Sequence, residues 1–369
     1  MSTLAVNTIT DANGGNTAKI NSMTPTADSL QGFRNRLINS DMRIDQRNAG
    51  AAVTTSGAFS ADRWAQGFVG AGALSLQQVT DAPTGFVNSI KSTVTTADGS
   101  LAASDNYQAM YQTIEGNNIA DLAWGTASAK TITVSFWAKA SVTGTYCFNI
   151  RNNGAARSYV STFAIASANT WEYKTITVAG DTSGTWLTTN GVGAIVMFGS
   201  VQGSDKQVPS LDTWTAGNYM AHSSQTNWIG TLNATLQITG AQFEVGSVAT
   251  PFERRPYGTE LMLCQRYYYT IGGTALYEFV GAGCVSATNT ILIYVPMQVK
   301  MRAGPTLTTA GNFLAKSNGS NVSATGLTTD QAGTQTFSFT ASATATTGQG
   351  CVLFADNSTA TRFNLSAEL

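Results

Sequence analysis

Apolar and polar residues alternate with a period of two along most of the chain, which predicts β-strands. The clearest case is segment 131–140, TITVSFWAKA, whose apolar face comprises Ile132, Val134, Phe136 and Ala138. Similar runs occur at 73–79, 89–95, 107–114, 146–151, 159–165, 171–180, 194–201 and 232–239, and others follow Tyr269. Turn residues separate the runs about every 10–15 positions, near the spacing of an antiparallel sandwich. The pattern therefore predicts an all-β chain.

The alternation changes phase once, in the run that ends near residue 245. Leu236 and Ile238 place the apolar face on even positions, whereas Ala241 and Phe243 place it on odd ones. A glycine accommodates an extra residue in a strand most easily. We expect a β-bulge or a strand break at Thr239–Gly240.

The segment 117–125, NNIADLAWG, is the one place where the pattern predicts helical turns. Ile119, Leu122 and Ala123 lie on one face at helical spacing. We expect one or two turns there and no other helix.

A charge-dense stretch at 238–269 separates two strand-rich regions. Pro251, Pro256 and Gly258 prevent one regular strand or helix from running straight through it. We expect a structural junction in which an ion network locks two domains together, formed by Glu253, Arg254, Arg255, Tyr257, Glu260 and Arg266. An anion-binding patch is the alternative. In the strand expected after the junction, Tyr267 and Tyr269 share a face opposite Tyr268, so one set is expected to be buried and the other exposed.

Four regions follow from these patterns. Residues 1–34 are expected to form an attachment segment, because its two short runs flank a DANGGN turn and an isolated hairpin is only marginally stable. The other three regions expected are a β-sandwich at 35–250, the junction at 251–264 and a smaller β domain at 265–369.

Charged residues make up only 11% of the chain, against about 25% in ordinary soluble proteins, and the net charge is −1. This balance gives no electrostatic attraction to nucleic acid or to an anionic membrane, and no apolar run is long enough to span a bilayer. The four cysteines are widely spaced and are expected to be free thiols. Only five charged residues follow Pro305, and contact between identical copies would account for the shortage.

The sequence offers no convincing catalytic site. His222 is the single histidine, no GxSxG motif surrounds a serine, and the cysteine spacing does not suit zinc. The carboxylate pairs that glycoside hydrolysis would need, Asp41 with Asp45 and Glu244 with Glu253, are expected to be solvated surface groups. We therefore expect no enzyme activity, no cofactor and no metal, with calcium at a turn such as Asp98 or Asp181 left open.

Carbohydrate binding is harder to dismiss, because several aromatic residues lie near turns amid amide and hydroxyl side chains. Sugar-binding modules place flat aromatic rings on an exposed sheet face or in loops. The candidate residues are Trp137, Trp214, Tyr219 and Trp228, with Trp171, Tyr173 and Trp186 in similar surroundings. Packing beneath loops or at a subunit interface is the alternative for each of them.

Several segments together resemble tail-fibre and head-fibre-like structural proteins of bacteriophages, notably those of marine and cyanobacterial hosts. The matching segments are VNTITDANGGNTAKIN (6–21), LQGFRNRLINSDMRIDQRNAGA (30–51), FSADRW (59–64), IADLAWGTASAKTITVSFWAKAS (119–141), LQITGAQFEVGSVATPFERRPYGTELMLCQRYYY (236–269), VPMQVKMRAGPTLT (295–308) and the terminal AEL. The resemblance implies a jelly-roll sandwich like that of carbohydrate-binding modules at 35–250, and a homotrimer. It supplies no catalytic residues.

The resulting hypothesis is a non-enzymatic virion structural protein, such as a short tail fibre, that contributes to host-surface recognition. It would be assembled in the host cytoplasm and exposed on the particle, with the N-terminal segment attached to other virion proteins. The partners expected are identical copies, virion proteins and host-surface glycans, with no nucleic acid and no membrane insertion. The alternatives are a head fibre or decoration protein, a carbohydrate-binding module of a glycan-degrading system, and a depolymerase spike.

Overall fold

The computed structural model describes residues 32–369, so nearly all of the expected attachment segment lies outside the described residues. Contacts divide the chain into two compact units. Of the described residues, the first unit comprises 32–43, Ala52–Ala58 and Ala65–Arg255, and the second comprises Ile44–Ala51, Phe59–Trp64 and Pro256–Leu369.

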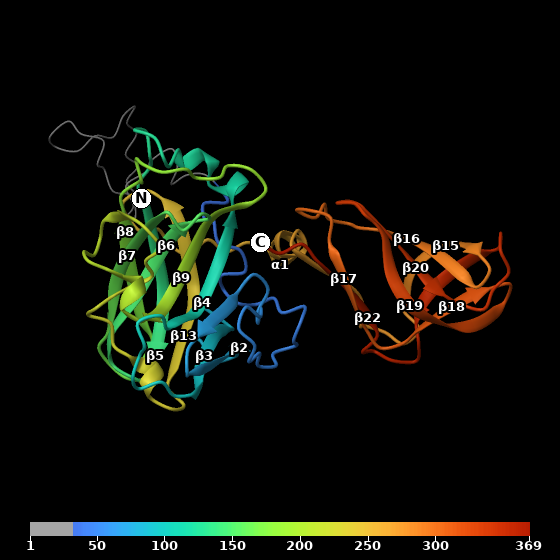
Figure 1. The fold of residues 1–369 in the computed structure, drawn as a ribbon, viewed down its shortest axis with the longest axis horizontal. Coiled ribbons are helices and arrows are strands. Elements are labelled where there is room, and N and C mark those ends of the chain that lie inside the picture. Colours follow the sequence, from blue (N-terminus) through green and yellow to red (C-terminus); the bar gives the residue numbers. More distant parts are fainter. Residues whose placement is uncertain (1–31) are drawn as a thin grey trace, which may run out of the picture. The chain divides into compact units, whose positions relative to one another are not determined.

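The first unit contains two large antiparallel sheets (Figure 1). One sheet has the order β1 (Ala65–Val69), β4 (Asn106–Glu115), β9 (Val192–Gln202), β6 (Gly144–Asn152), β7 (Arg157–Ile165) and β11 (Trp214–Ala216). The other has the order β2 (Ala73–Val79), β3 (Ser89–Thr96), β13 (Thr235–Val245), β5 (Ile132–Ala140) and β8 (Glu172–Val178). A short parallel pair, β10 (Gln207–Val208) and β12 (Ala221–His222), and four 3-10 turns, η1 (Gly116–Asn118), η2 (Ala120–Leu122), η3 (Ser204–Lys206) and η4 (Trp228–Gly230), complete the unit.

The apolar faces of the two sheets pack against each other. Phe136 of β5 lies with its ring centroid 5.1 Å from that of Phe163 on β7 and 5.0 Å from that of Phe198 on β9. Ile132, Val134 and Phe136 are fully buried, as the period of two predicts. The predicted all-β, sandwich-type fold class is confirmed.

Strand β13 carries the predicted bulge. Its register against β5 shifts between Thr239 and Gln242, and Gly240 has φ +58°. Ile238 before the bulge and Ala241 and Phe243 after it are fully buried, so the extra residue keeps both halves of the strand facing the core. The predicted β-bulge is confirmed.

The second unit contains the only α-helix of the described residues, a three-stranded sheet and a closed barrel. The helix is α1 (Tyr257–Gln265), and the sheet has the order β14 (Tyr268–Gly272), β22 (Arg362–Ser366) and β17 (Thr306–Ala310). The barrel runs β15 (Phe279–Ala287), β16 (Thr290–Pro296), β20 (Thr336–Ser342), β19 (Ser320–Ala332), β18 (Phe313–Ser317) and β21 (Gly350–Ala355). Phe363 of β22 packs against Phe313 and Phe339 of the barrel, with ring centroids 4.4 and 4.8 Å away.

Helix α1 corrects the expectation of a single helical segment at 117–125. That segment does form the two 3-10 turns η1 and η2, but a longer helix begins directly after Pro256. A proline just before a helix costs nothing there, because the first-turn amides have no partner within the helix. Pro256 therefore marks the start of the helix, and Gly258 lies within it, so neither residue excludes a helix.

Two segments from the early part of the chain, Ile44–Ala51 and Phe59–Trp64, belong to the second unit, although the sequence patterns place them with the sandwich. The nearly buried guanidinium groups of Arg63 and Arg47 both pair with the carboxylate of Glu368. Each guanidinium also lies over an aromatic ring, at 3.6 Å from the Tyr267 centroid for Arg63 and 3.7 Å from the Tyr268 centroid for Arg47. A buried carboxylate requires such partners, which the charge pattern alone does not reveal.

The same packing corrects the expectation for the tyrosine run. Tyr267, Tyr268 and Tyr269 are all buried, with exposed fractions of 0%, 7% and 7%. Tyr267 precedes β14 and lies beneath Arg63, so the alternation of a single strand does not govern it.

Gly240→Ala is expected to lower the free energy of unfolding by about 2–4 kcal/mol. The backbone has a positive φ, and an added Cβ would lie 2.5 Å from Cζ of Phe86. Urea denaturation followed by tryptophan fluorescence measures the change, because every tryptophan except Trp64 lies in the first unit. Gly99→Ala is the matched control, since its Cβ would meet no atom within 4 Å. Equal stability of the two variants would contradict the account of the bulge.

Candidate functional site

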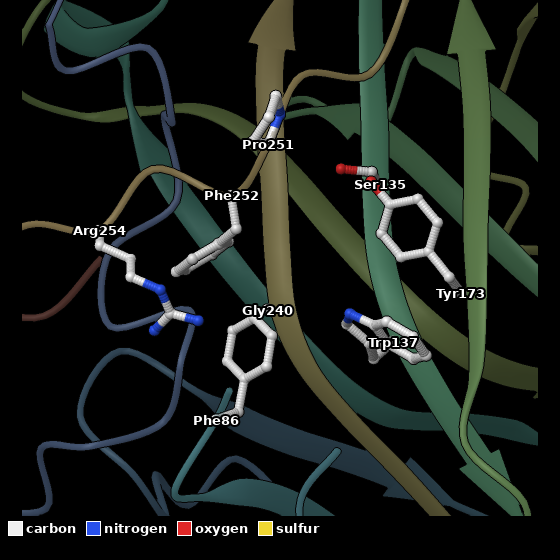
Figure 2. A pocket seen from close by; sticks show the side chains of 8 residues that line it. All are labelled: Phe86, Ser135, Trp137, Tyr173, Gly240, Pro251, Phe252 and Arg254. Carbon is white, nitrogen blue, oxygen red and sulfur yellow. The ribbon is translucent and has the colours of Figure 1, made fainter. Parts of the chain in front are cut away.

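The outer face of the five-stranded sheet carries an open pocket of about 510 Å³ (Figure 2). It lies on the opposite side of β5 from the core residue Phe136, and it is framed by β5, β8, β13 and two connecting segments. Its lining residues, all from the first unit, are Phe86, Ser135, Trp137, Tyr173, Gly240, Pro251, Phe252 and Arg254.

One side of the pocket is formed by Trp137 and Tyr173. The two residues are directly opposite each other on β5 and β8, and their ring centroids lie 5.4 Å apart at an angle of 53°. Tyr173 is 47% exposed and Trp137 is half-buried. A cross-strand aromatic pair of this kind contributes about 0.2–1 kcal/mol, which favours the observed arrangement of the two rings.

The other side is formed by Phe86 and Phe252, which come from the β2–β3 connection and from the segment after β13. Their ring centroids are 5.2 Å apart at 68°, an edge-to-face arrangement. The Phe86 ring lies against Gly240, where any side chain would collide with it. The β-bulge that keeps β13 in register therefore also provides the space for this aromatic pair.

Arg254 is the one charged residue that lines the pocket. Its guanidinium carbon lies 4.7 Å from the Phe86 centroid and 5.7 Å from the Phe252 centroid, and Nη2 donates a hydrogen bond of 2.6 Å to the carbonyl of Gly85. Figure 2 shows the guanidinium beside the two phenylalanine rings. Cation–π contact and the hydrogen bond fix the position of this positive charge.

A polar cluster lies two residues along β5 from Trp137. Lys139 forms an ion pair with Asp81, and Asp81 also accepts hydrogen bonds from Gln237 Nε2 at 3.1 Å and Trp171 Nε1 at 3.4 Å. The Lys139 hydrogen bond lowers the pKa of Asp81 below its ordinary value. The negative charge of Asp81 is therefore compensated locally.

Buried polar contacts anchor the segment that carries Pro251, Phe252 and Arg254. Glu244 accepts hydrogen bonds from the amide and hydroxyl of Thr250, at 2.8 and 2.6 Å. Gln242 Oε1 accepts one from the Glu253 amide at 2.7 Å. These contacts hold the segment across the outer face of β13.

This anchoring corrects the expectation that the acidic pairs are solvated. Glu244 is 1% exposed, and the Glu253 carboxylate accepts hydrogen bonds from the amides of Arg34 and Asn35 at 3.0 and 2.9 Å. Asp41 is 5% exposed and pairs with Arg43 at 2.5 Å. The period of two places Glu244 on the outer face correctly, but it does not show that a later segment covers that face.

Of the four expected sugar-binding residues, the pocket contains only Trp137. Trp228 is fully buried, and its Nε1 donates to the carbonyl of Gly199 at 3.2 Å. Trp214 packs in a cluster with Trp124 and Trp186 at 5.3 Å from each, while Tyr219 is half-buried in the loop that follows. The predicted set is therefore dispersed.

The sequence patterns do not mark Phe86 or Phe252 as site residues, and they place Arg254 in the junction. Tyr173 belongs to the aromatic residues near turns, and the signal for its role is that it and Trp137 both lie on polar faces of amphipathic strands. No local pattern marks the two phenylalanines, because they meet only when the chain folds.

The six expected junction residues fall in both units. In the first unit, Arg255 pairs with Glu253 at 3.2 Å and donates to the Leu37 carbonyl at 3.2 Å. The other members lie in the second unit, Tyr257 and Glu260 in α1 and Arg266 directly after it. A role in fixing one domain against the other stays a prediction.

Other candidate chemistry is sparse in the described part of the chain. Residues 32–369 contain no group of three or more His, Cys, Asp or Glu that could hold a metal ion. Asp98 accepts a hydrogen bond from Tyr107 at 2.7 Å, and Asp181 forms a two-point pair with Arg157 at 2.6 and 2.8 Å. All four cysteines are free thiols. No described helix has the length and apolar character needed to cross a bilayer.

The chain matches no protein-family model. Its sequence also matches no curated protein.

Solved structures with a weak likeness include a phage enzyme domain and two sugar-binding modules. The enzymatically active domain of tailspike protein 4 from bacteriophage CBA120 has 14% identity and a TM-score of 0.29, and the match covers 59% of this chain and 22% of that chain. A family 11 carbohydrate-binding module from Clostridium thermocellum, in complex with a mixed-linked tetrasaccharide, has 12% identity and a TM-score of 0.28, with 54% and 98% covered. A C-terminal family 22 module from the same organism has 13% identity and a TM-score of 0.28, with 56% and 100% covered. Matches at these scores transfer no function.

A fully buried tryptophan and a half-buried one are expected to contribute differently to the stability of the fold. Trp228→Ala is expected to lower the free energy of unfolding by about 3–5 kcal/mol, because it removes a fully buried ring and leaves a cavity. Trp137→Ala is expected to cost only about 1 kcal/mol, since that ring is partly in water. Thermal unfolding followed by far-UV circular dichroism measures both. A larger loss for Trp137→Ala than for Trp228→Ala would contradict the assignment.

Proposed function

We propose that the protein is a non-enzymatic virion structural protein that binds glycans in the pocket on the outer face of its five-stranded sheet. The observation that carries the binding role is the pair of half-buried Trp137 and exposed Tyr173, which faces the Phe86–Phe252 pair across an open pocket. The virion assignment rests on the sequence resemblance to phage fibre proteins.

The chemistry of the pocket suits a sugar ring. A pyranose has an apolar face of C–H groups that packs on an aromatic ring, and hydroxyls around its edge that need hydrogen-bond partners. Trp137 and Tyr173 supply the flat surfaces, while the indole N–H, the phenol and Ser135 supply polar groups beside them. The volume of about 510 Å³ lies in the ordinary range for small-ligand sites.

Binding suits the pocket better than catalysis does. The eight lining residues include no carboxylate, histidine or cysteine. Glycoside hydrolysis uses two carboxyl groups on opposite sides of the scissile bond, and this lining supplies neither. The function proposed is therefore recognition of a host-surface glycan without cleavage.

Self-association is the second part of the proposal, and the outer face of the barrel supports it. Ala282, Leu292 and Val352 point outward on adjacent strands, in register with Tyr294 and Cys284 nearby. Phe279 is 60% exposed and Tyr294 is 54% exposed. Lys316 of β18 lies directly opposite Val352, so one positive charge borders this group. Apolar groups gathered on one face are typical of a surface that another protein covers. The proposed occupants are the other copies of a homotrimer.

The binding proposal is tested by titration with oligosaccharides that a glycan array identifies. Wild-type protein is expected to bind at least one glycan class, and Trp137→Ala and Tyr173→Ala are each expected to weaken binding about 10- to 100-fold, since stacking of a ring on one aromatic side chain is worth about 1–3 kcal/mol. Isothermal titration calorimetry gives the dissociation constants.

Tyr219→Ala provides the matched control, because Tyr219 is a half-buried tyrosine of the same unit outside the pocket. It is expected to bind like the wild type. An array with no hits, or a Trp137→Ala variant that binds as tightly as the wild type, would remove the proposed site.

Sedimentation velocity tests the self-association. The 369-residue chain is expected to sediment as a trimer of the 38.7 kDa protomer, and Tyr294→Lys is expected to shift it toward monomer because a charge would be buried in the contact. Thr329→Lys adds the same charge at an exposed position of β19 and is expected to leave the trimer intact. A stable monomer for the wild type would refute this part of the proposal.

A further inference from the structure

The guanidinium of Arg254 stands out among the charged groups around the pocket. It is exposed, and no carboxylate lies within 4 Å of it among residues 32–369. Its one hydrogen bond is the 2.6 Å contact from Nη2 to the Gly85 carbonyl. A guanidinium has five N–H donors, so most of its donors are left for another partner.

Acidic groups near the pocket are already neutralised by other cations. Asp81 pairs with Lys139. Glu253, adjacent in sequence, pairs with Arg255 at 3.2 Å. Arg254 is therefore left as an uncompensated positive charge at the edge of an aromatic pocket.

The position of Arg254 is also fixed before any ligand arrives. The guanidinium lies 4.7 Å from the Phe86 centroid and 5.7 Å from the Phe252 centroid, and the backbone on either side is anchored through Glu253 and Arg255. A group held in advance loses little conformational entropy on binding. Its planar N–H fork suits the two or three oxygens of an oxyanion.

We propose that the pocket selects an acidic sugar, in which Arg254 pairs with a carboxylate or sulfate group while the sugar ring stacks on Trp137 or Tyr173. This inference rests on the proposed glycan-binding function and specifies its ligand class. The oxyanion supplies the negative charge that the pocket lacks. Asp81 pairs with Lys139 and Glu253 with Arg255, which leaves Arg254 as the main electrostatic determinant.

A purely structural role for Arg254 is the competing explanation. In that case the guanidinium serves only to cover the two phenylalanine rings, and ligand binding does not depend on its charge. The two explanations differ in what they predict for the anion dependence of binding.

The test begins with a glycan array that presents neutral, uronate-containing and sulfated oligosaccharides to the wild-type protein. Hits are expected in the uronate or the sulfated class, and the two classes distinguish the two sources of the anionic group. Hits confined to neutral glycans would overturn this inference and leave the glycan-binding function in place. An array without hits would overturn both.

Calorimetric titration of the best acidic oligosaccharide then measures the contribution of Arg254. Arg254→Gln is expected to weaken binding about 10- to 100-fold, the range of a charge-assisted hydrogen-bonded pair, and wild-type affinity is expected to fall as sodium chloride is raised. Loss of the carboxyl charge by methyl esterification of a uronate ligand is expected to have a similar effect.

Lys206→Gln is the matched control, because it removes one positive charge from the same unit at a position outside the pocket lining. It is expected to bind like the wild type. Far-UV circular dichroism and the melting temperature verify that Arg254→Gln is folded. A folded Arg254→Gln variant with unchanged affinity for the acidic glycan would overturn the inference.

Discussion

The one-residue bulge in β13 is the constraint on which the candidate site depends. A strand that faces a core with one side cannot change phase unless an extra residue is inserted, and Gly240 provides it at φ +58°. Because Gly240 has no side chain, the Phe86 ring fits against the outer face at that point. Phe252 packs on Phe86, and Arg254 packs on both. Gly240 therefore both keeps the core face of β13 buried and leaves the space that the Phe86 ring occupies in the pocket.

Covering the outer face of β13 has an energetic cost that the structure offsets with hydrogen bonds. Gln242 and Glu244 are nearly inaccessible to water, and a buried polar group without a partner costs roughly 1–3 kcal/mol. Thr250 and the amide of Glu253 satisfy them, which places the segment 251–254 at the edge of the pocket. The polar residues that would be surface groups on an open sheet thus position one wall of the site.

The sequence was sufficient for features governed by local periodicity and insufficient for features governed by distant contacts. The strands, the bulge at Gly240 and the helical turns near 117–125 follow from residue spacing. Residue spacing does not predict helix α1, because a proline can end a strand as well as precede a helix, as Pro256 does. The alternation places Trp137 on a polar face, whereas Phe86 and Phe252 are 166 positions apart and carry no shared pattern. Trp228 looked like a loop aromatic, and only the packed fold shows that it is buried.

The central claim is that glycans bind at the aromatic pocket, and indole N–H resonances of ¹⁵N-labelled protein test it most directly. Each tryptophan gives one indole signal, and Trp137→Phe identifies the signal of Trp137. Saturation with the best oligosaccharide from the array is predicted to shift the Trp137 signal and to leave the signal of the fully buried Trp228 in place. A glycan that binds while the Trp137 signal stays unchanged would contradict the account.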